Sequence, residues 1–177
     1  MAWRRLFLVL QQPLVAVPLG AQTDSTRPAI AVLNLRFDGE HANVLEPGDT
    51  AVVQAATSRL YATLRASERV AVIDSGAVAV AVRAAEAAGN PCDNACAAAI
   101  ARRLQARWVV KGTVTKTSNL VWILTAQLLD AATGRPLLAD SYELKGDART
   151  MAPAGAHVLA QRIERALAAP ATGAASP

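Results

Sequence analysis

The sequence predicts an α/β fold: a mixed sheet of about five strands covered by helices, in the order β-α-β-α-α-β-β-β-α. Three observations lead to this prediction. Residues 106–145 contain three consecutive runs of strand character separated by two short turns, which predicts an antiparallel three-strand meander. Two short runs rich in β-branched residues, 29–35 and 70–74, precede it and predict further strands. The remaining stretches carry apolar residues at helical spacing, so helices are expected to cover the sheet.

The composition indicates one folded domain. The 177 residues are 53% hydrophobic and only 4% aromatic, which predicts a core of alanine, valine and leucine that folds without a metal. The formal net charge is +4, and it falls by two charges without Arg4 and Arg5. Because the other basic residues are scattered, we expect no nucleic acid partner.

The first 21 residues have the layout of a secretory signal peptide. Arg4 and Arg5 precede an apolar stretch that Pro13 interrupts, and small residues lie near Ala21. The stretch is too short to span a membrane, so no stable membrane insertion is expected after signal removal. We expect a periplasmic or secreted protein with a signal peptide, a linker, a single domain and a disordered tail, at 1–21, 22–28, 29–167 and 168–177.

The helices are expected to begin at short polar residues, whose side chains can accept hydrogen bonds from free backbone N–H groups. The expected caps are Asp49, Ser75 and either Asp93 or Asn94. The expected helices span residues 49–64, 75–88, 93–104 and, after the meander, 150–167. Residues 36–48, between the first strand and the first helix, are expected to form a loop.

The meander is expected to consist of strands at 108–116, 120–129 and 137–145. The first alternates in character, with Lys111 and Thr113 on one face and Gly112 on the other. The second is apolar at successive positions, which predicts a central strand covered on both faces. The third carries Asp140, Glu143 and Lys145, charges that are typical of an edge strand.

Three segments of the sequence resemble a known family. They are Pro-Cys-Asp-Asn-Ala-Cys at 91–96, Ile-Ala-Arg-Arg-Leu-Gln-Ala-Arg-Trp-Val-Val-Lys-Gly-Thr-Val at 100–114 and Lys-Thr-Ser-Asn-Leu at 116–120. Their order is similar to a bacterial family of small secreted proteins of unknown function and, more distantly, to the amino-terminal domain of TolB and to CsgG-like envelope proteins. The resemblance covers about residues 29–163 and implies an exported α/β domain with no established activity. The chain departs from the family's pattern at Gln105, where glycine is usual, and lacks the Trp-containing segment that follows the meander.

Cys92 and Cys96 are the only cysteines, and an exported protein with two cysteines is expected to pair them. Their spacing at a helix start places the Cα atoms about 6 Å apart, within the range that a disulfide accepts. We favour a structural disulfide that holds the Pro91 loop against the helix. A redox-active dithiol stays open, although the usual redox spacing is C-x-x-C.

Acidic and basic residues offer weaker signals. The acidic residues between the first strand and the first helix are expected to be solvated loop charges: Asp38, Glu40, Glu46 and Asp49. Several basic residues could form a patch, but a solvated face is the simpler interpretation: Arg102, Arg103, Arg107, Lys111 and Lys116. A zinc site built from the cysteines and His41 or His157 is disfavoured because the thiols are expected to be oxidised, and we expect no metal or cofactor.

The sequence therefore predicts a non-enzymatic, exported binding module of the cell envelope. No serine has the context of a hydrolase nucleophile. The third meander strand and one hairpin are candidate surfaces for an envelope protein partner, since an exposed edge can accept another strand. The hairpin residues are Thr117, Ser118, Asn119 and Leu120.

Two other functions stay open. One is a small-ligand sensor that uses Asp38 and Asp74, because ligands bind at the carboxyl ends of strands in open α/β sheets. The other is a thiol–disulfide oxidoreductase that uses Cys92 and Cys96.

Overall fold

The computed structural model of the chain describes residues 27–38, 46–89, 91–118 and 120–169. The predicted signal peptide, most of the predicted linker, nearly all of the predicted tail and the single residue Asn119 lie outside the described residues. Glu40 and His41 lie outside them as well.

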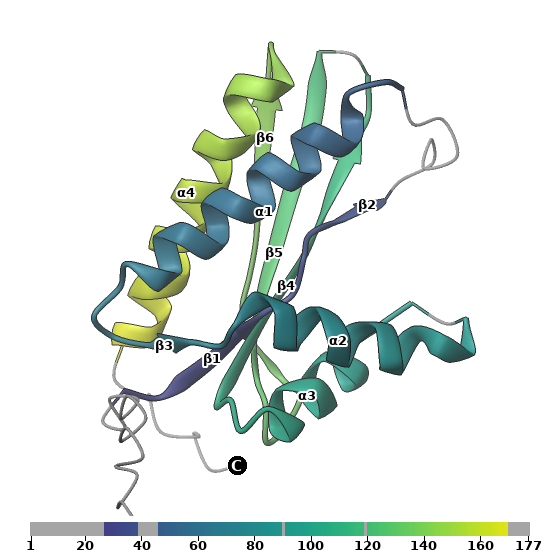
Figure 1. The fold of residues 1–177 in the computed structure, drawn as a ribbon. Coiled ribbons are helices and arrows are strands. Elements are labelled where there is room, and N and C mark those ends of the chain that lie inside the picture. Colours follow the sequence, from purple (N-terminus) through teal and green to yellow (C-terminus); the bar gives the residue numbers. More distant parts are fainter. Residues whose placement is uncertain (1–26, 39–45, 90, 119, 170–177) are drawn as a thin grey trace, which may run out of the picture.

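The described residues form a mixed sheet with helices on both faces, as predicted (Figure 1). The strands are β1 (Ala29–Val32), β2 (Arg36–Asp38), β3 (Ala71–Val72), β4 (Trp108–Lys116), β5 (Val121–Asp130) and β6 (Pro136–Lys145). Their order is β3-β1-β4-β5-β6, with β2 paired to the later part of β4. β1 runs parallel to β3 and β4, whereas β4, β5 and β6 form the predicted antiparallel meander, with β6 at one edge.

The sheet has one strand more than predicted, because the expected loop at 36–48 begins with β2. After a break at Leu33–Leu35 the chain continues alongside β4, and Arg36 pairs with Thr113. The break is possible because Gly112 has no side chain. A Cβ at this position would clash with the carbonyl oxygen of Thr125 and with the side chain of Leu35.

The helices begin close to the predicted positions. They are α1 (Asp49–Arg65), α2 (Ser75–Ala85), a 3₁₀ turn η1 (Glu86–Ala88), α3 (Asn94–Arg103) and α4 (Ala148–Ala168). Asp93 caps α3, as one of the two predicted alternatives. Two predicted caps are wrong: Asp74, not Ser75, caps α2 through its bond from Ala77 N, and Asp49 is the first residue of α1 rather than its cap.

The helices bury the two faces of the sheet to different extents. α1 and α4 lie along the long strands, where the main core includes Leu60, Leu124 and Leu159 (Figure 1). α2 and α3 are gathered near the start of β4, over a smaller core that includes Val109 and Leu129. The prediction that the second meander strand is covered on both faces is therefore wrong for most of β5, since its residues away from α1 and α4 stay half-buried up to Leu129.

The backbone conformation of Gln105, which follows α3, accounts for the glycine that is usual at this position in the family that the sequence resembles. Its φ is 58°, in the left-handed region that glycine adopts without strain. Among the described residues, none of the helices has the length and hydrophobicity needed to cross a membrane.

Candidate functional site

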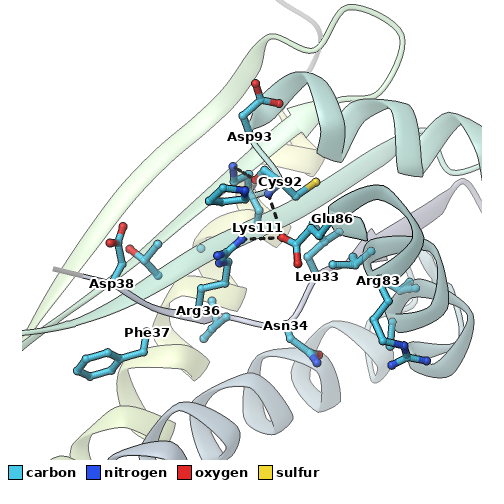
Figure 2. Close-up of a pocket in the computed structure, with 17 residues that line it drawn as sticks. Leu33, Asn34, Arg36, Phe37, Asp38, Arg83, Glu86, Cys92, Asp93 and Lys111 are labelled. Atoms are coloured by element: carbon cyan, nitrogen blue, oxygen red, sulfur yellow. Dashed lines mark hydrogen bonds and ion pairs between the residues drawn. The ribbon is translucent and has the colours of Figure 1, made fainter. Parts of the chain in front are cut away.

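A cleft of about 610 Å³ opens where the α2–α3 layer ends and the uncovered part of the sheet begins (Figure 2). Its floor is formed by residues 33–38 and by Lys111, Gly112 and Thr113 of β4. Its walls come from α2, from Glu86 of η1 and from residues 91–93 before α3. The volume lies within the range of small-molecule sites.

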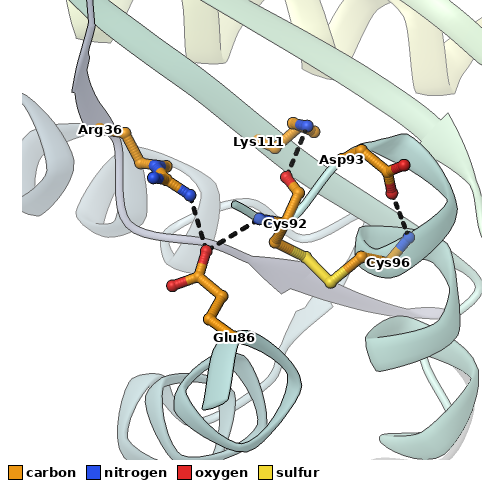
Figure 3. Close-up of a disulfide and its surroundings, with 6 residues drawn as sticks. All are labelled: Arg36, Glu86, Cys92, Asp93, Cys96 and Lys111. Atoms are coloured by element: carbon orange, nitrogen blue, oxygen red, sulfur yellow. Dashed lines mark hydrogen bonds and ion pairs between the residues drawn. A yellow bond between two sulfur atoms is a disulfide. The ribbon is translucent and has the colours of Figure 1, made fainter. Parts of the chain in front are cut away.

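The predicted disulfide between Cys92 and Cys96 is present and lies in one wall of the cleft (Figure 3). The backbone of Cys92 links three charged side chains. Its N–H donates to Glu86 Oε1 at 2.9 Å, and its carbonyl accepts a bond from Lys111 Nζ at 2.9 Å. Arg36 Nη1 lies 2.6 Å from the same Glu86 oxygen. The disulfide therefore fixes a backbone segment that joins β4 to the end of α2.

Lys111 is the unusual charge of this cleft. Its side chain is half-buried, and burial lowers the pKa of its ammonium group, since a charged form is costly away from water. Asp93 opposes this shift and Arg36 adds to it. Among the described residues, Lys111 Nζ has a hydrogen bond to the Cys92 carbonyl but no carboxylate within ion-pair distance.

The two ligand-binding residues predicted from the sequence, Asp38 and Asp74, do not lie in the same site. Asp38 lines the cleft (Figure 2). Asp74 does not line it, and its carboxylate accepts a bond from Ala77 N at the start of α2. The structure thus offers Asp38 a place in a cleft and gives Asp74 a local role in the helix.

A second charged cluster surrounds Lys116 at the end of β4. Its ammonium lies 2.8 Å from Glu46 Oε2 and 3.1 Å from Asp49 Oδ2, and 5.4 Å from the ring centroid of Trp122. The side-chain hydrogen bond to Glu46, followed by that to Asp49, raises the pKa of Lys116. The expectation of solvated acidic residues is wrong for Asp49, whose side chain is only 9% exposed. It is buried because the start of α1 packs against the end of β4.

The basic residues do not form one patch. Lys111 and Lys116 lie on opposite faces of β4, since they are an odd number of residues apart in a strand. Arg102 donates to the carbonyl of Ala131 at 2.7 Å, and the Arg107 guanidinium lies 4.7 Å from the ring centroid of Trp108. These contacts give each residue a separate local role.

The hairpin between β4 and β5 is tied to the end of β6. Gly146 N donates to the carbonyl of Leu120 at 3.0 Å, and Val121 N donates to Ser118 Oγ at 3.1 Å. The side chain of Leu120 is nevertheless 69% exposed. Leu137, near the start of β6, is 54% exposed. Leu137 therefore lies on β6 itself, whereas Leu120 lies in the hairpin, on the side of β6 that is paired with β5.

The remaining histidine among the described residues, His157, is half-buried between α1 and α4. Its Nδ1 lies 3.1 Å from Thr63 Oγ1, and its Nε2 lies 3.1 Å from Gln161 Nε2. The Thr63 hydroxyl also donates to the carbonyl of Arg59. These bonds join the two helices. No group of three or more metal-ligating side chains occurs in the described part of the chain.

Arg36 and Glu86 were not predicted from the sequence as site residues, and Lys111 was named only as a member of a possible basic patch. A weak signal was present for Lys111, a lone charge inside the β-branched run 109–114. Glu86 gave no signal, because its partners Arg36 and Cys92 are brought to it by the fold.

A family model described as "Protein of unknown function (DUF2380)" matches residues 28–163, which confirms the predicted resemblance to a family of unknown function. No curated protein matches the chain.

Several solved structures are similar at low sequence identity. The hypothetical protein CT253 from Chlamydia trachomatis is 14% identical, with a TM-score of 0.51, over 81% of this chain and 100% of that one. The PelC dodecamer from Paraburkholderia phytofirmans is 19% identical, with a TM-score of 0.47, over 81% and 89%. TolB from Acinetobacter baumannii is 19% identical, with a TM-score of 0.48, over 80% of this chain and 28% of that one. The likeness to CT253 bears on the fold alone, and we draw no conclusion from the other two.

Proposed function

We propose from the geometry that the chain, which belongs to the DUF3280 family of proteins of unknown function, is a non-enzymatic, exported binding module of the cell envelope. The family itself supplies no activity. The observation that carries this proposal is the edge position of β6, which pairs only with β5 among the described residues and carries the exposed side chain of Leu137. We propose that this edge and the 117–120 hairpin bind an extended segment of an envelope protein.

The edge has the properties of a strand acceptor. β6 is ten residues long, and within the described part of the chain it pairs on one side only, with β5. An unpaired edge presents backbone donors and acceptors that an added strand can satisfy, while side-chain contacts supply specificity. Leu137 would supply an apolar contact near the start of β6, and Leu120 would supply one at the exposed hairpin.

Export is supported by two features of the chain. The layout of residues 1–21 predicts a signal peptide. The disulfide between Cys92 and Cys96 is a bond typical of oxidising compartments such as the periplasm. The domain limits of 29–167, with a linker before and a disordered tail after, remain part of this proposal.

The test is crosslinking in cells with a tagged, exported copy, followed by mass spectrometry of captured envelope proteins. We expect a stoichiometric partner whose capture is lost in Leu120→Glu and in Leu137→Glu. Val80→Glu is the matched control, because Val80 is an equally exposed apolar residue on α2, at 59% exposure. Capture that survives both edge variants, or that Val80→Glu also abolishes, would refute the β6 edge as the binding surface.

A small-ligand sensor is the second candidate function, and the cleft lined by Asp38 and Lys111 favours it. Thiol–disulfide exchange ranks third. Cys92 is buried, at 6% exposure, so its sulfur offers little access to a substrate thiol.

A further inference from the structure

The cleft beside α2 contains a half-buried cation, Lys111, that forms no ion pair with a described residue, although the charge of Asp93 acts on it from a distance. Lys111 Nζ donates to the neutral Cys92 carbonyl at 2.9 Å, which uses one of its three donors. An ammonium group removed from water needs an opposite charge or a full set of hydrogen bonds to offset its lost hydration. We infer that the cleft is a binding site for a small organic monocarboxylate, whose carboxylate contacts Lys111 and whose apolar part packs against α2.

The side chains nearest to Lys111 do not complete its contacts. Gln127 lies on β5, directly opposite Lys111 and on the same face of the sheet, yet the two side chains form no hydrogen bond. Gln127 Oε1 is buried without a partner among the described residues. Asp93 directs its carboxylate to the N–H of Cys96 at 2.8 Å, as the cap of α3. Lys111 therefore turns toward the cleft with two donors left for a ligand.

A second cation reaches the same space. Arg36 Nη1 contacts Glu86, but a guanidinium group has five donors, so Arg36 keeps others for a ligand oxygen. Figure 2 shows Arg36 pointing into the cleft toward Glu86, whereas the head of Arg83 lies apart from them. Lys111 and Arg36 are thus the two cations that a bound carboxylate would meet.

The charges and shape of the cleft limit the class of ligand. Three carboxylates line the cleft beside its cations, so a doubly charged anion such as phosphate would be repelled more than a single carboxylate: Asp38, Glu86 and Asp93. The α2 wall supplies apolar contacts from Val78 and Val82. A singly charged head with a short apolar chain satisfies both conditions.

The experiment is an NMR titration of the purified, disulfide-bonded chain with hexanoate, followed at the amide signals of Gly112 and Thr113. We expect these signals to shift to saturation with hexanoate, and about tenfold more weakly with hexanamide, which has the same shape without the charge. Inorganic phosphate is expected to bind more weakly than hexanoate.

Variants assign the effect to the cleft. Lys111→Met keeps the apolar stem and is expected to weaken hexanoate binding about tenfold. Arg103→Met removes an exposed charge on α3 and is expected to leave binding unchanged. The inference is overturned if hexanoate gives no saturable shift at the cleft. It is also overturned if hexanamide binds the native chain as tightly as hexanoate does, or if the Lys111→Met chain binds hexanoate as tightly as the native chain does. The site is independent of the β6 edge, so either proposal can fail alone.

Discussion

Lys111 and Lys116 belong to the same strand, and the fold treats their charges in opposite ways. Lys116 faces the side covered by α1 and α4, where two carboxylates and the Trp122 ring surround its ammonium. Lys111 faces the partly uncovered side, where its hydrogen bond is to a neutral carbonyl. The pKa of Lys116 is raised and that of Lys111 is lowered.

This difference separates a residue that stabilises the fold from one that is available to a ligand. Removing Asp49 from the Lys116 cluster would leave the ammonium with Glu46 as its remaining carboxylate partner, so we expect the cluster to be structural. Lys111 forms no ion pair with a described residue, and perturbed charges of this kind gather at functional sites. The contrast leads to the following predictions.

The largest effect is expected at Gly112, which lies between the two lysines. Gly112→Ala places a Cβ against the Thr125 carbonyl and the Leu35 side chain, so both regions of β4 must shift. We expect a loss of about 3 kcal/mol in the free energy of unfolding, measured by urea denaturation. Gly76→Ala is the control, because its Cβ would meet a single atom, Asp74 Oδ1 at 3.0 Å, and its loss should be much smaller. A neutral Gly112→Ala would show that the close packing of Leu35 is wrong.

The next effect tests the Lys116 cluster. Asp49→Ala removes a buried carboxylate that accepts bonds from Lys116 and from Glu46 N. We expect the melting temperature to fall by roughly 5–10 °C in thermal unfolding followed by circular dichroism. Lys111→Met should cause no comparable loss, because it removes a charge without stranding another. Equal losses in the two variants would contradict the division of roles.

The disulfide is expected to have a smaller and more local effect. The double variant Cys92→Ser, Cys96→Ser should lose about 2 kcal/mol of unfolding free energy, since the closed loop is short. Hydrogen exchange should speed up at Cys92 and along the start of α3, while β6 and α4 keep their protection. Uniformly faster exchange would indicate that the disulfide holds the whole fold rather than one wall of the cleft.

The smallest effect is in the pH dependence of stability. Because the folded pKa of Lys116 lies above the ordinary value of 10.5, its contribution is present below that value and is lost as the pH rises through the folded pKa. The folded pKa of Lys111 lies below 10.5, so stability rises as the pH climbs from that pKa to 10.5. Lys111→Met should therefore melt slightly higher than the native chain near neutral pH. This difference in melting temperature should vanish at about pH 11. A difference that stays constant with pH would contradict the lowered pKa of Lys111.

The sequence could predict the scaffold but not the cleft. Period-2 alternation placed Lys111 and Thr113 on one face of a strand, and the four-residue spacing of the cysteines predicted their bond. The strand β2 escaped prediction because its three residues are too few to show an alternating strand pattern, and they form a strand only by pairing with β4. The Cys92 carbonyl contact with Lys111 joins residues from separate elements, so no local pattern contains it.

The buried position of Asp49 escaped prediction for a similar reason. An acidic residue after a glycine and before a helical pattern is normally an exposed cap. Its partner Lys116 lies 67 positions along the chain, and the two meet only once α1 packs on the end of β4.

The most direct measurement is the pKa of the lysine side chains by NMR, using ¹³C-labelled lysine. The chain has only three lysines, Lys111, Lys116 and Lys145, so single Lys→Met variants assign every signal. We predict that Lys111 titrates below 10.5 and Lys116 above it, and that saturating hexanoate moves the pKa of Lys111 upward while leaving Lys116 unchanged. A Lys111 that titrates at or above 10.5 without ligand, or whose pKa hexanoate leaves unchanged, would contradict the contrast between the two lysines.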